Sequence, residues 1–130
     1  MDKKYLSKII ATDNEGLQMI SAYCAGAEVK VTDIKYLKKS KVFLLSLKRS
    51  KVETDNVDKK IISICKFEFV DQVKSKNIEQ RDQEKKLELI GMDYLKNKEN
   101  YEISLIFTKN AYITLSTEII EVTLDDQNKL

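Results

Sequence analysis

The chain of 130 residues contains no histidine, no proline and no tryptophan, and it has only three glycines and two cysteines. The absence of histidine removes the side chain that enzymes most often use for general acid–base catalysis near neutral pH. Cys24 and Cys65 stand in no CxxC pair and no Cys/His cluster, so the spacing of a structural zinc site is missing. The sequence therefore excludes the commonest catalytic centre and predicts no metal and no cofactor.

Signals for export and for membrane insertion are also missing. Met1 to Ala11 alternate charged and apolar residues, whereas a secretory signal has a continuous apolar core. No stretch approaches the roughly 18 apolar residues that a membrane-spanning helix needs, and there is no N-x-[ST] sequon. We therefore expect a cytoplasmic protein without a membrane span, in which both cysteines are free thiols.

The composition is that of a soluble globular protein, with 42% hydrophobic and 34% charged residues. We expect one domain covering residues 1–130, because this length suits a single compact core. The 23 basic and 21 acidic residues leave a net charge of +2, which argues against nucleic acid as the partner. Lysines outnumber arginines 21 to 2, so a run of lysines alone predicts no site.

One helix is predicted near the start of the chain, after a short strand over residues 5–11. Thr12-Asp13-Asn14 supplies side-chain oxygens that can accept hydrogen bonds from the first free amides of a helix. Leu17, Ile20 and Cys24 then form one apolar stripe, and Gly26 is suited to end the helix in a left-handed turn. The apolar stripe predicts that the helix packs on a sheet.

From Val29 to Leu124 the apolar residues follow a period of two, which is typical of strands. The phase changes at Asp33, at Gly91 and again before Ile120, which predicts bends or bulges there. The predicted strands include 42–49 as a central strand, 60–73 as one long strand, and a hairpin that turns at Lys109-Asn110; residues 50–59 are a solvated connection and 74–86 a mobile loop.

This pattern predicts an α+β protein that is mainly β: a curled antiparallel sheet or partly closed barrel of about seven strands, with the N-terminal helix on its open face. The alternative is a split barrel like that of pleckstrin-homology domains, although such barrels usually end with their helix.

Several segments resemble a family of short alphaproteobacterial proteins of unknown function. The resemblance is carried by Leu6-Ser7-Lys8-Ile9-Ile10-Ala11, by Ala27-Glu28-Val29-Lys30-Val31-Thr32-Asp33, by Phe43-Leu44-Leu45-Ser46-Leu47-Lys48-Arg49 and by residues 103–124. Members of that family often carry a histidine where Tyr23 stands, and this chain departs from them there. The resemblance implies a bacterial cytoplasmic protein, and it implies no activity.

Arg49 is the first candidate for a ligand-binding residue, because it is one of only two arginines and it ends a predicted buried strand. Its planar guanidinium could hold a carboxylate or phosphate through two parallel hydrogen bonds, which lysine cannot do. The alternative, which we favour at this point, is a structural ion pair with Glu53 or Glu68.

Other side chains give weaker indications. Glu118 with Glu121, and Glu68 with Asp71, could divide acid and base roles, but a solvated outer face explains these carboxylates as well. Cys24 and Cys65 lie on predicted apolar faces, where a buried and inert thiol is expected. The lysines of residues 38–41 beside Tyr36 could meet a phosphate backbone, but a polar hairpin turn needs no such role.

These observations favour a non-catalytic module that binds another protein, or a second copy of itself, through a sheet edge or a hairpin turn. The alternative is a binder of a small anionic ligand or lipid headgroup that uses Arg49 at the mouth of the barrel. A nucleic-acid binder and an enzyme rank below both. A barrel interior filled by Phe43, Phe67, Phe69 and Phe107 would argue against the ligand binder.

Overall fold

The computed structural model describes residues 8–50 and 60–127, and these residues form one helix and ten strands of a single antiparallel sheet. A short 3-10 turn over Val31–Asp33 lies between two of the strands. The helix is α1 (Asn14–Cys24). The strands are β1 (Lys8–Ala11), β2 (Glu28–Lys30), β3 (Ile34–Leu37), β4 (Val42–Ser50), β5 (Lys60–Phe67), β6 (Val70–Lys76), β7 (Lys86–Asn97), β8 (Asn100–Phe107), β9 (Ala111–Thr117) and β10 (Val122–Asp126).

The helix forms where the sequence predicts it. The side chain of Asp13 accepts a hydrogen bond from the backbone N–H of Gly16 at 2.8 Å, which caps the first turn. Leu17, Ile20 and Cys24 are fully buried, and Gly26 has a φ of 84°, in the left-handed region that glycine adopts readily. The predicted N-cap, apolar stripe and end of the helix are therefore confirmed.

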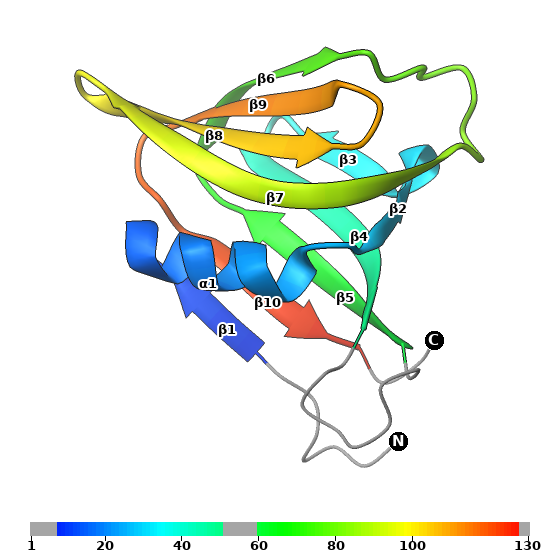
Figure 1. The fold of residues 1–130 in the computed structure, drawn as a ribbon. Coiled ribbons are helices and arrows are strands. Elements are labelled where there is room, and N and C mark those ends of the chain that lie inside the picture. Colours follow the sequence, from blue (N-terminus) through cyan, green and yellow to red (C-terminus); the bar gives the residue numbers. More distant parts are fainter. Residues whose placement is uncertain (1–7, 51–59, 128–130) are drawn as a thin grey trace.

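The strands follow the order β1-β10-β5-β4-β2-β7-β8-β9-β6. β3 lies off this path and pairs with β4 on the same edge as β2, at the other end of β4. The sheet folds over itself, because β2 pairs with both β4 and β7 and so joins its two halves. One half contains β7, β8, β9 and β6 and lies above the half that contains β3, β4, β5, β10 and β1 (Figure 1). The curled, antiparallel and unclosed sheet confirms the predicted fold, with ten strands where about seven were expected.

The prediction of one long strand over residues 60–73 is wrong. The chain leaves β5 at Phe67 and enters β6, in the other half of the sheet, at Val70. Between them Phe69 takes a left-handed φ of 58° and is 40% exposed, although the alternating pattern placed its ring inside. The backbone N–H of Glu118 donates to the carbonyl of Phe69, which ties this corner to the segment after β9. Apolar and polar residues alternate in the same phase before and after this corner, so the sequence pattern alone cannot reveal it.

The predicted loop over residues 74–86 is wrong in its first part. Lys74, Ser75 and Lys76 continue β6, which pairs with β9 through Lys76. The sequence does not indicate this part of the strand, because the inward position holds Ser75 and lysines occupy the outward positions, so no apolar alternation continues past Val73. The predicted bend at Asp33, the bulge at Gly91 and the turn at Lys109-Asn110 are all present. The predicted connection at 50–59 lies, apart from Ser50, outside the described residues.

The core fills the space between the two halves of the sheet. Phe43, Phe67 and Phe107 are each at most 1% exposed. The helix α1 packs against β7 and β1, and the hydroxyl of Ser21 accepts a hydrogen bond from the backbone N–H of Met92 at 2.8 Å. β7 pairs with β2 only over Lys86–Glu88, and α1 lies along the part of β7 that follows (Figure 1). No helix in the described part of the chain is long and apolar enough to cross a membrane.

Candidate functional site

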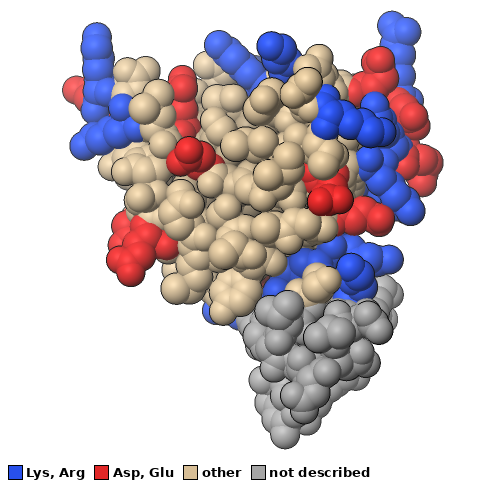
Figure 2. Space-filling view, viewed as in Figure 1, with Lys and Arg blue, Asp and Glu red and all other residues tan. Residues whose placement is uncertain are grey.

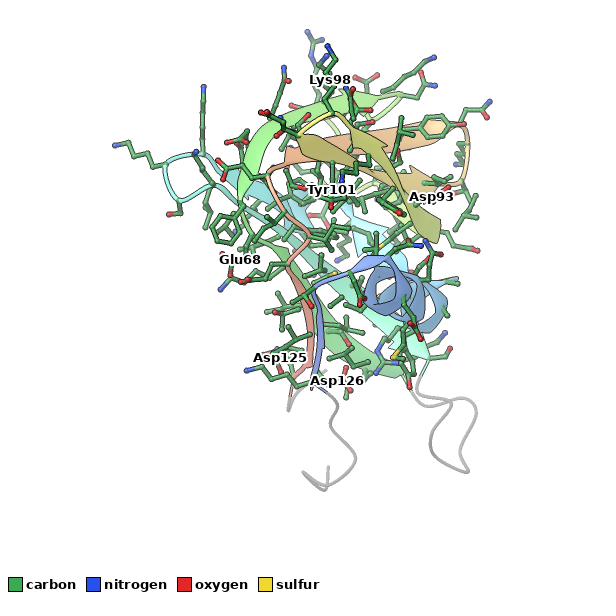
Figure 3. All side chains as sticks on the ribbon, turned by 90° about the vertical axis from the view of Figure 1, so that its left-hand side faces the viewer. Glu68, Asp93, Lys98, Tyr101, Asp125 and Asp126 are labelled. Atoms are coloured by element: carbon green, nitrogen blue, oxygen red, sulfur yellow. The ribbon has the colours of Figure 1, made fainter. Side chains whose placement is uncertain are left out.

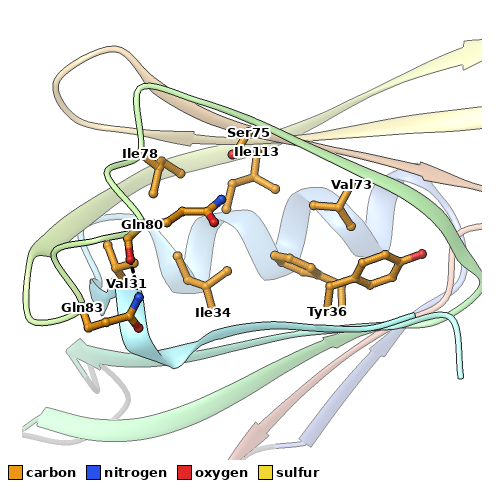
Figure 4. Close-up of a pocket in the computed structure, with 10 residues that line it drawn as sticks. Val31, Ile34, Tyr36, Val73, Ser75, Ile78, Gln80, Gln83 and Ile113 are labelled. Carbon is orange, nitrogen blue, oxygen red and sulfur yellow. Dashed lines mark hydrogen bonds between the residues drawn. The ribbon is translucent and has the colours of Figure 1, made fainter. Parts of the chain in front are cut away.

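The sheet stays open between β3 and β6, and this opening is the candidate site. β3 pairs with β4 alone, and β6 pairs with β9 alone. Each strand therefore has one side that takes part in no ladder within the described residues. The two strands lie on opposite sides of a pocket, and their side chains face one another across it (Figure 4). We call this pocket the β3–β6 slot.

The two ends of the β3–β6 slot are held by hydrogen bonds. At one end the backbone N–H of Val70 donates to the carbonyl of Lys41 at 2.8 Å, and the hydroxyl of Tyr36 donates to the carbonyl of Val70 at 2.8 Å. At the other end the backbone N–H of Val31 donates to the carbonyl of Lys85 at 3.0 Å. Thr32 donates to Gln83 in the same way, also at 3.0 Å. The walls of the slot are therefore fixed at both ends, and its long sides are not paired.

The β3–β6 slot has a volume of about 360 Å³, and its lining combines apolar side chains with a comparable share of uncharged polar groups. It is formed by Val31, Ile34, Tyr36, Phe43, Val73, Ser75, Ile78, Gln80, Gln83 and Ile113. The side chain of Gln83 donates a hydrogen bond to the carbonyl of Gln80, which orders the loop side of the slot. The size of the slot lies within the range of binding pockets, which combine apolar side chains with polar groups that orient the bound molecule.

A second, shallower hollow continues from the first. It shares Tyr36 and Val73 with the β3–β6 slot and extends to Lys38, Asp71, Gln72, Asn100 and Ser116. Two hollows that share side chains form a longer surface than a single pocket would. The arrangement suits an elongated occupant better than a compact one.

Charges surround the β3–β6 slot but do not line it. Lys41 lies at one end, where its Nζ is 3.0 Å from a carboxylate oxygen of Asp71 and 3.9 Å from one of Glu118. The hydrogen bond to Asp71, together with the two negative charges, raises the pKa of Lys41. Of the carboxylates considered as acid–base pairs, Asp71 and Glu118 share Lys41 as a partner, and Glu68 pairs with Lys66 at 3.1 Å.

Arg49 lies elsewhere, at the end of β4 remote from the turn that leads out of β3. Its Nη2 is 3.0 Å from both carboxylate oxygens of Asp126, and its Nε donates to the hydroxyl of Ser63 at 3.0 Å. The guanidinium carbon lies 5.5 Å from the centre of the Tyr23 ring. Arg49 and Asp126 are both buried, and Asp126 stands at the lower end of β10 (Figure 3).

The structure therefore gives Arg49 an ion-pair partner that the sequence did not suggest. Of the two expected partners, Glu68 pairs with Lys66 and Glu53 lies outside the described residues. Asp126 was missed because it is 77 positions away along the chain, and only the pairing of β10 with β5 brings it close. Anion binding by Arg49 stays a prediction.

The two cysteines are buried and unpaired with each other, as expected. Burial raises the pKa of Cys24 to about 12, an effect that the positive charge of Arg49 partly opposes, and burial also raises the pKa of Cys65. Both thiols are therefore protonated at neutral pH. Among the described residues no group of three or more His, Cys, Asp and Glu side chains could hold a metal ion.

Sequence reasoning did not bring the residues of the β3–β6 slot together as a site. Ile34 and Tyr36 lie where the apolar period of two predicts a strand, but Ser75, Ile78, Gln80 and Gln83 fell in the segment 74–86 predicted as a mobile loop. One signal was available: Ile78 is the only apolar residue between Lys74 and Lys86, and burying its side chain against the sheet is favourable.

The comparisons with known proteins place the chain in a family. A family model described as "Protein of unknown function (DUF2948)" matches residues 7–130. No curated protein and no solved structure matches the chain. The resemblance to a family of unknown function is confirmed at this level, and the alphaproteobacterial source stays a prediction. The chain belongs to the DUF2948 family of proteins of unknown function.

Proposed function

We propose that this protein is a non-catalytic interaction module that binds an extended segment of another protein between β3 and β6. The observation that carries the proposal is the pair of facing sheet edges with an apolar slot between them. In strand addition, main-chain hydrogen bonds to an exposed edge provide affinity, and pockets for alternate side chains provide specificity. The β3–β6 slot offers both kinds of contact side by side.

The length of the slot limits the segment that it can accept. β3 has four residues, which span about 13 Å at the usual rise of about 3.3 Å per residue. A segment of similar length would place one or two side chains in the slot, while the next residues lie over the shallower hollow at Gln72 and Asn100. The slot is therefore suited to binding a short peptide motif and is too small to bind the surface of a whole domain.

The packing of aromatic side chains between the two halves of the sheet supports edge binding over a ligand held deep between these halves. Phe43, Phe67 and Phe107 occupy the space between the two halves, although Phe69 does not. Arg49, the residue expected to hold an anion, lies in a buried ion pair with Asp126. Both features favour an interaction module.

The test uses a variant that blocks the slot and a matched variant that does not. Ser75→Phe places a large ring in the β3–β6 slot, because Ser75 lines it. Thr114→Phe is the control: Thr114 pairs with Lys74 on the neighbouring strand, one position from Ile113, so its side chain points to the opposite face of the sheet. Both changes leave the net charge unaltered.

Random extended peptides displayed on phage are selected on the unmodified protein, and the selected peptides are synthesised for measurement by fluorescence polarisation. We expect them to bind the Thr114→Phe variant as well as the unmodified protein and to lose binding to the Ser75→Phe variant. N-methylation of alternate backbone amides should also weaken binding, since it removes strand hydrogen bonds. If no selected peptide distinguishes the two variants, the proposal is wrong.

Self-association through the same edges gives a different result. In that case light scattering would show a dimer of the unmodified protein and a monomer of the Ser75→Phe variant, and this pair of masses would contradict binding of another protein at the slot.

A further inference from the structure

The two strands that border the β3–β6 slot carry a marked excess of positive charge. Residues 34–41, which form β3 and the following turn, and residues 70–76, which form β6, together contain six lysines and one acidic residue, Asp71. Their net charge is therefore 6 − 1 = +5, whereas the whole chain has +2, so the remaining residues sum to 2 − 5 = −3. The two bordering segments are thus more positive than the rest of the chain. The lysines are Lys35, Lys38, Lys39, Lys41, Lys74 and Lys76, and all six are exposed.

Only one of these lysines has an acidic partner. Lys41 pairs with Asp71 and lies near Glu118. The other five form no ion pair within the described part of the chain. Lys and Arg side chains project along the upper margin of the molecule, where β6 lies (Figures 1 and 2). The charges of these five lysines are therefore available to an incoming ligand.

The alternation of the two strands separates these charges from the apolar lining. On β3, Ile34 and Tyr36 line the β3–β6 slot, so Lys35 between them points to the outer face. On β6, Val73 and Ser75 line the slot, so Lys74 points outward in the same way. A strand inserted between β3 and β6 would have the apolar slot on one face and a lysine on each side of its other face.

We propose that the bound segment is an acidic peptide in which Asp or Glu alternates with apolar residues. This inference rests on the proposed function and adds the chemistry of the partner to it. The apolar side chains enter the β3–β6 slot, and the carboxylates on the outer face meet Lys35 and Lys74 from the neighbouring strands. Opposite charges at neighbouring positions across a sheet attract, and like charges repel.

A single-stranded nucleic acid fits this site less well, although lysines also attract phosphate. The aromatic ring next to the lysines, that of Tyr36, has its hydroxyl bonded to the carbonyl of Val70, so the ring is held in the wall of the slot. A base needs the open face of an aromatic ring for stacking. The unpaired backbone groups of two strand edges are suited to a peptide.

Three synthetic peptides of equal length test the inference, and in each of them valine alternates with one polar residue. The polar residue is aspartate in the first, serine in the second and lysine in the third. At low ionic strength we expect the aspartate peptide to bind about 2- to 30-fold more tightly than the serine peptide, as two cross-strand charge pairs would provide. The lysine peptide should bind more weakly than both, and added salt should reduce the differences.

A pair of variants locates the effect. Lys35→Gln combined with Lys74→Gln should remove most of the preference for the aspartate peptide and leave binding of the serine peptide unchanged. The control combines Lys8→Gln with Lys48→Gln, which lowers the net charge equally at β1 and at the far part of β4. If the control reduces the preference as much as the first pair, the interaction is with the whole field of the protein and the assignment to these lysines is wrong.

The outcomes separate this inference from the proposed function. If the aspartate and serine peptides bind equally well, and if Ser75→Phe abolishes the binding of both, the inference of an acidic partner is wrong and strand addition is supported. Absence of binding by all three peptides and by any phage-selected peptide would overturn both. Tighter binding of a single-stranded oligothymidylate than of the aspartate peptide, with loss of that binding in the Lys35/Lys74 variant, would show that the lysines serve a phosphate backbone and would overturn the inference.

Discussion

Replacing Arg49 with methionine should destabilise this protein strongly, because it leaves the buried carboxylate of Asp126 without the guanidinium. Arg49 Nη2 lies 3.0 Å from both oxygens of that carboxylate, and Arg49 is 1% exposed. Ser63 donates a hydrogen bond to Asp126 at 2.6 Å and cannot neutralise its charge. Removing one partner of a buried ion pair typically costs about 3–5 kcal/mol, and methionine keeps most of the apolar stem.

The expected loss is large enough to measure by urea denaturation. With a urea dependence of about 1–3 kcal/mol per M for a small domain, a loss of about 4 kcal/mol lowers the midpoint by about 1.3–4 M. Typical domains have about 5–15 kcal/mol in total, so the variant should keep little margin or unfold. Lys48→Met is the matched control: this neighbour of Arg49 is exposed, and its replacement should change stability by about 0.5 kcal/mol or less.

A second variant shows whether the loss comes from the buried negative charge of Asp126. Arg49→Met combined with Asp126→Leu removes both charges and should recover most of the stability, since apolar residues can replace a buried ion pair at little cost. A loss below about 1 kcal/mol in the single variant, or no recovery in the double variant, would refute the reasoning. The same two proteins also test anion binding by Arg49. If Arg49 binds phosphate, added phosphate should raise the urea midpoint of the unmodified protein and not that of Arg49→Met.

Two other expectations concern single residues. Because the folded state holds the Cys24 thiol protonated up to about pH 12 whereas the unfolded thiol ionises near 9.0, stability should fall as pH rises through this range. The slope from this thiol is at most about 1.4 kcal/mol per pH unit, and Cys24→Ala should remove this contribution from the pH dependence measured by urea denaturation, while that of Cys65 remains. Phe69→Gly should be more stable than Phe69→Ala by about 1 kcal/mol, since the φ of 58° suits glycine. At Glu68, whose φ is not left-handed, the same pair should show the reverse order in thermal denaturation.

Local patterns were sufficient to predict the parts of the fold that local chemistry decides. Asp13 caps α1 and Gly26 ends it, because a free amide and a left-handed turn each call for a particular residue type. The bulge at Gly91 and the turn at Lys109 and Asn110 follow the same logic. Each of these features depends on a few consecutive residues, and a single sequence contains them.

Features that depend on distant segments could not be predicted in this way. The corner at Phe69 interrupts no apolar period, so residues 60–73 looked like one strand. The partner of Arg49 comes from β10, and the slot forms only when β6 folds over to face β3. The candidate site was therefore invisible as a site, although Ile34, Tyr36 and Val73 were each assigned to strands. Loop closure and sheet order decide such contacts, and neither is written in local periodicity.

The lysines at the β3–β6 slot also explain how this protein can keep two sheet edges open. An unpaired edge invites pairing with another copy, and charged side chains on the edge, lysines above all, are a common means of preventing it. A second copy docked edge to edge would bring its own Lys74 and Lys76 toward those of the first, and like charges at such positions repel. An acidic strand meets no such repulsion and gains attraction instead. The same side chains therefore disfavour self-association and favour an acidic partner, which is how an interface gains specificity from a repulsive element as well as an attractive one.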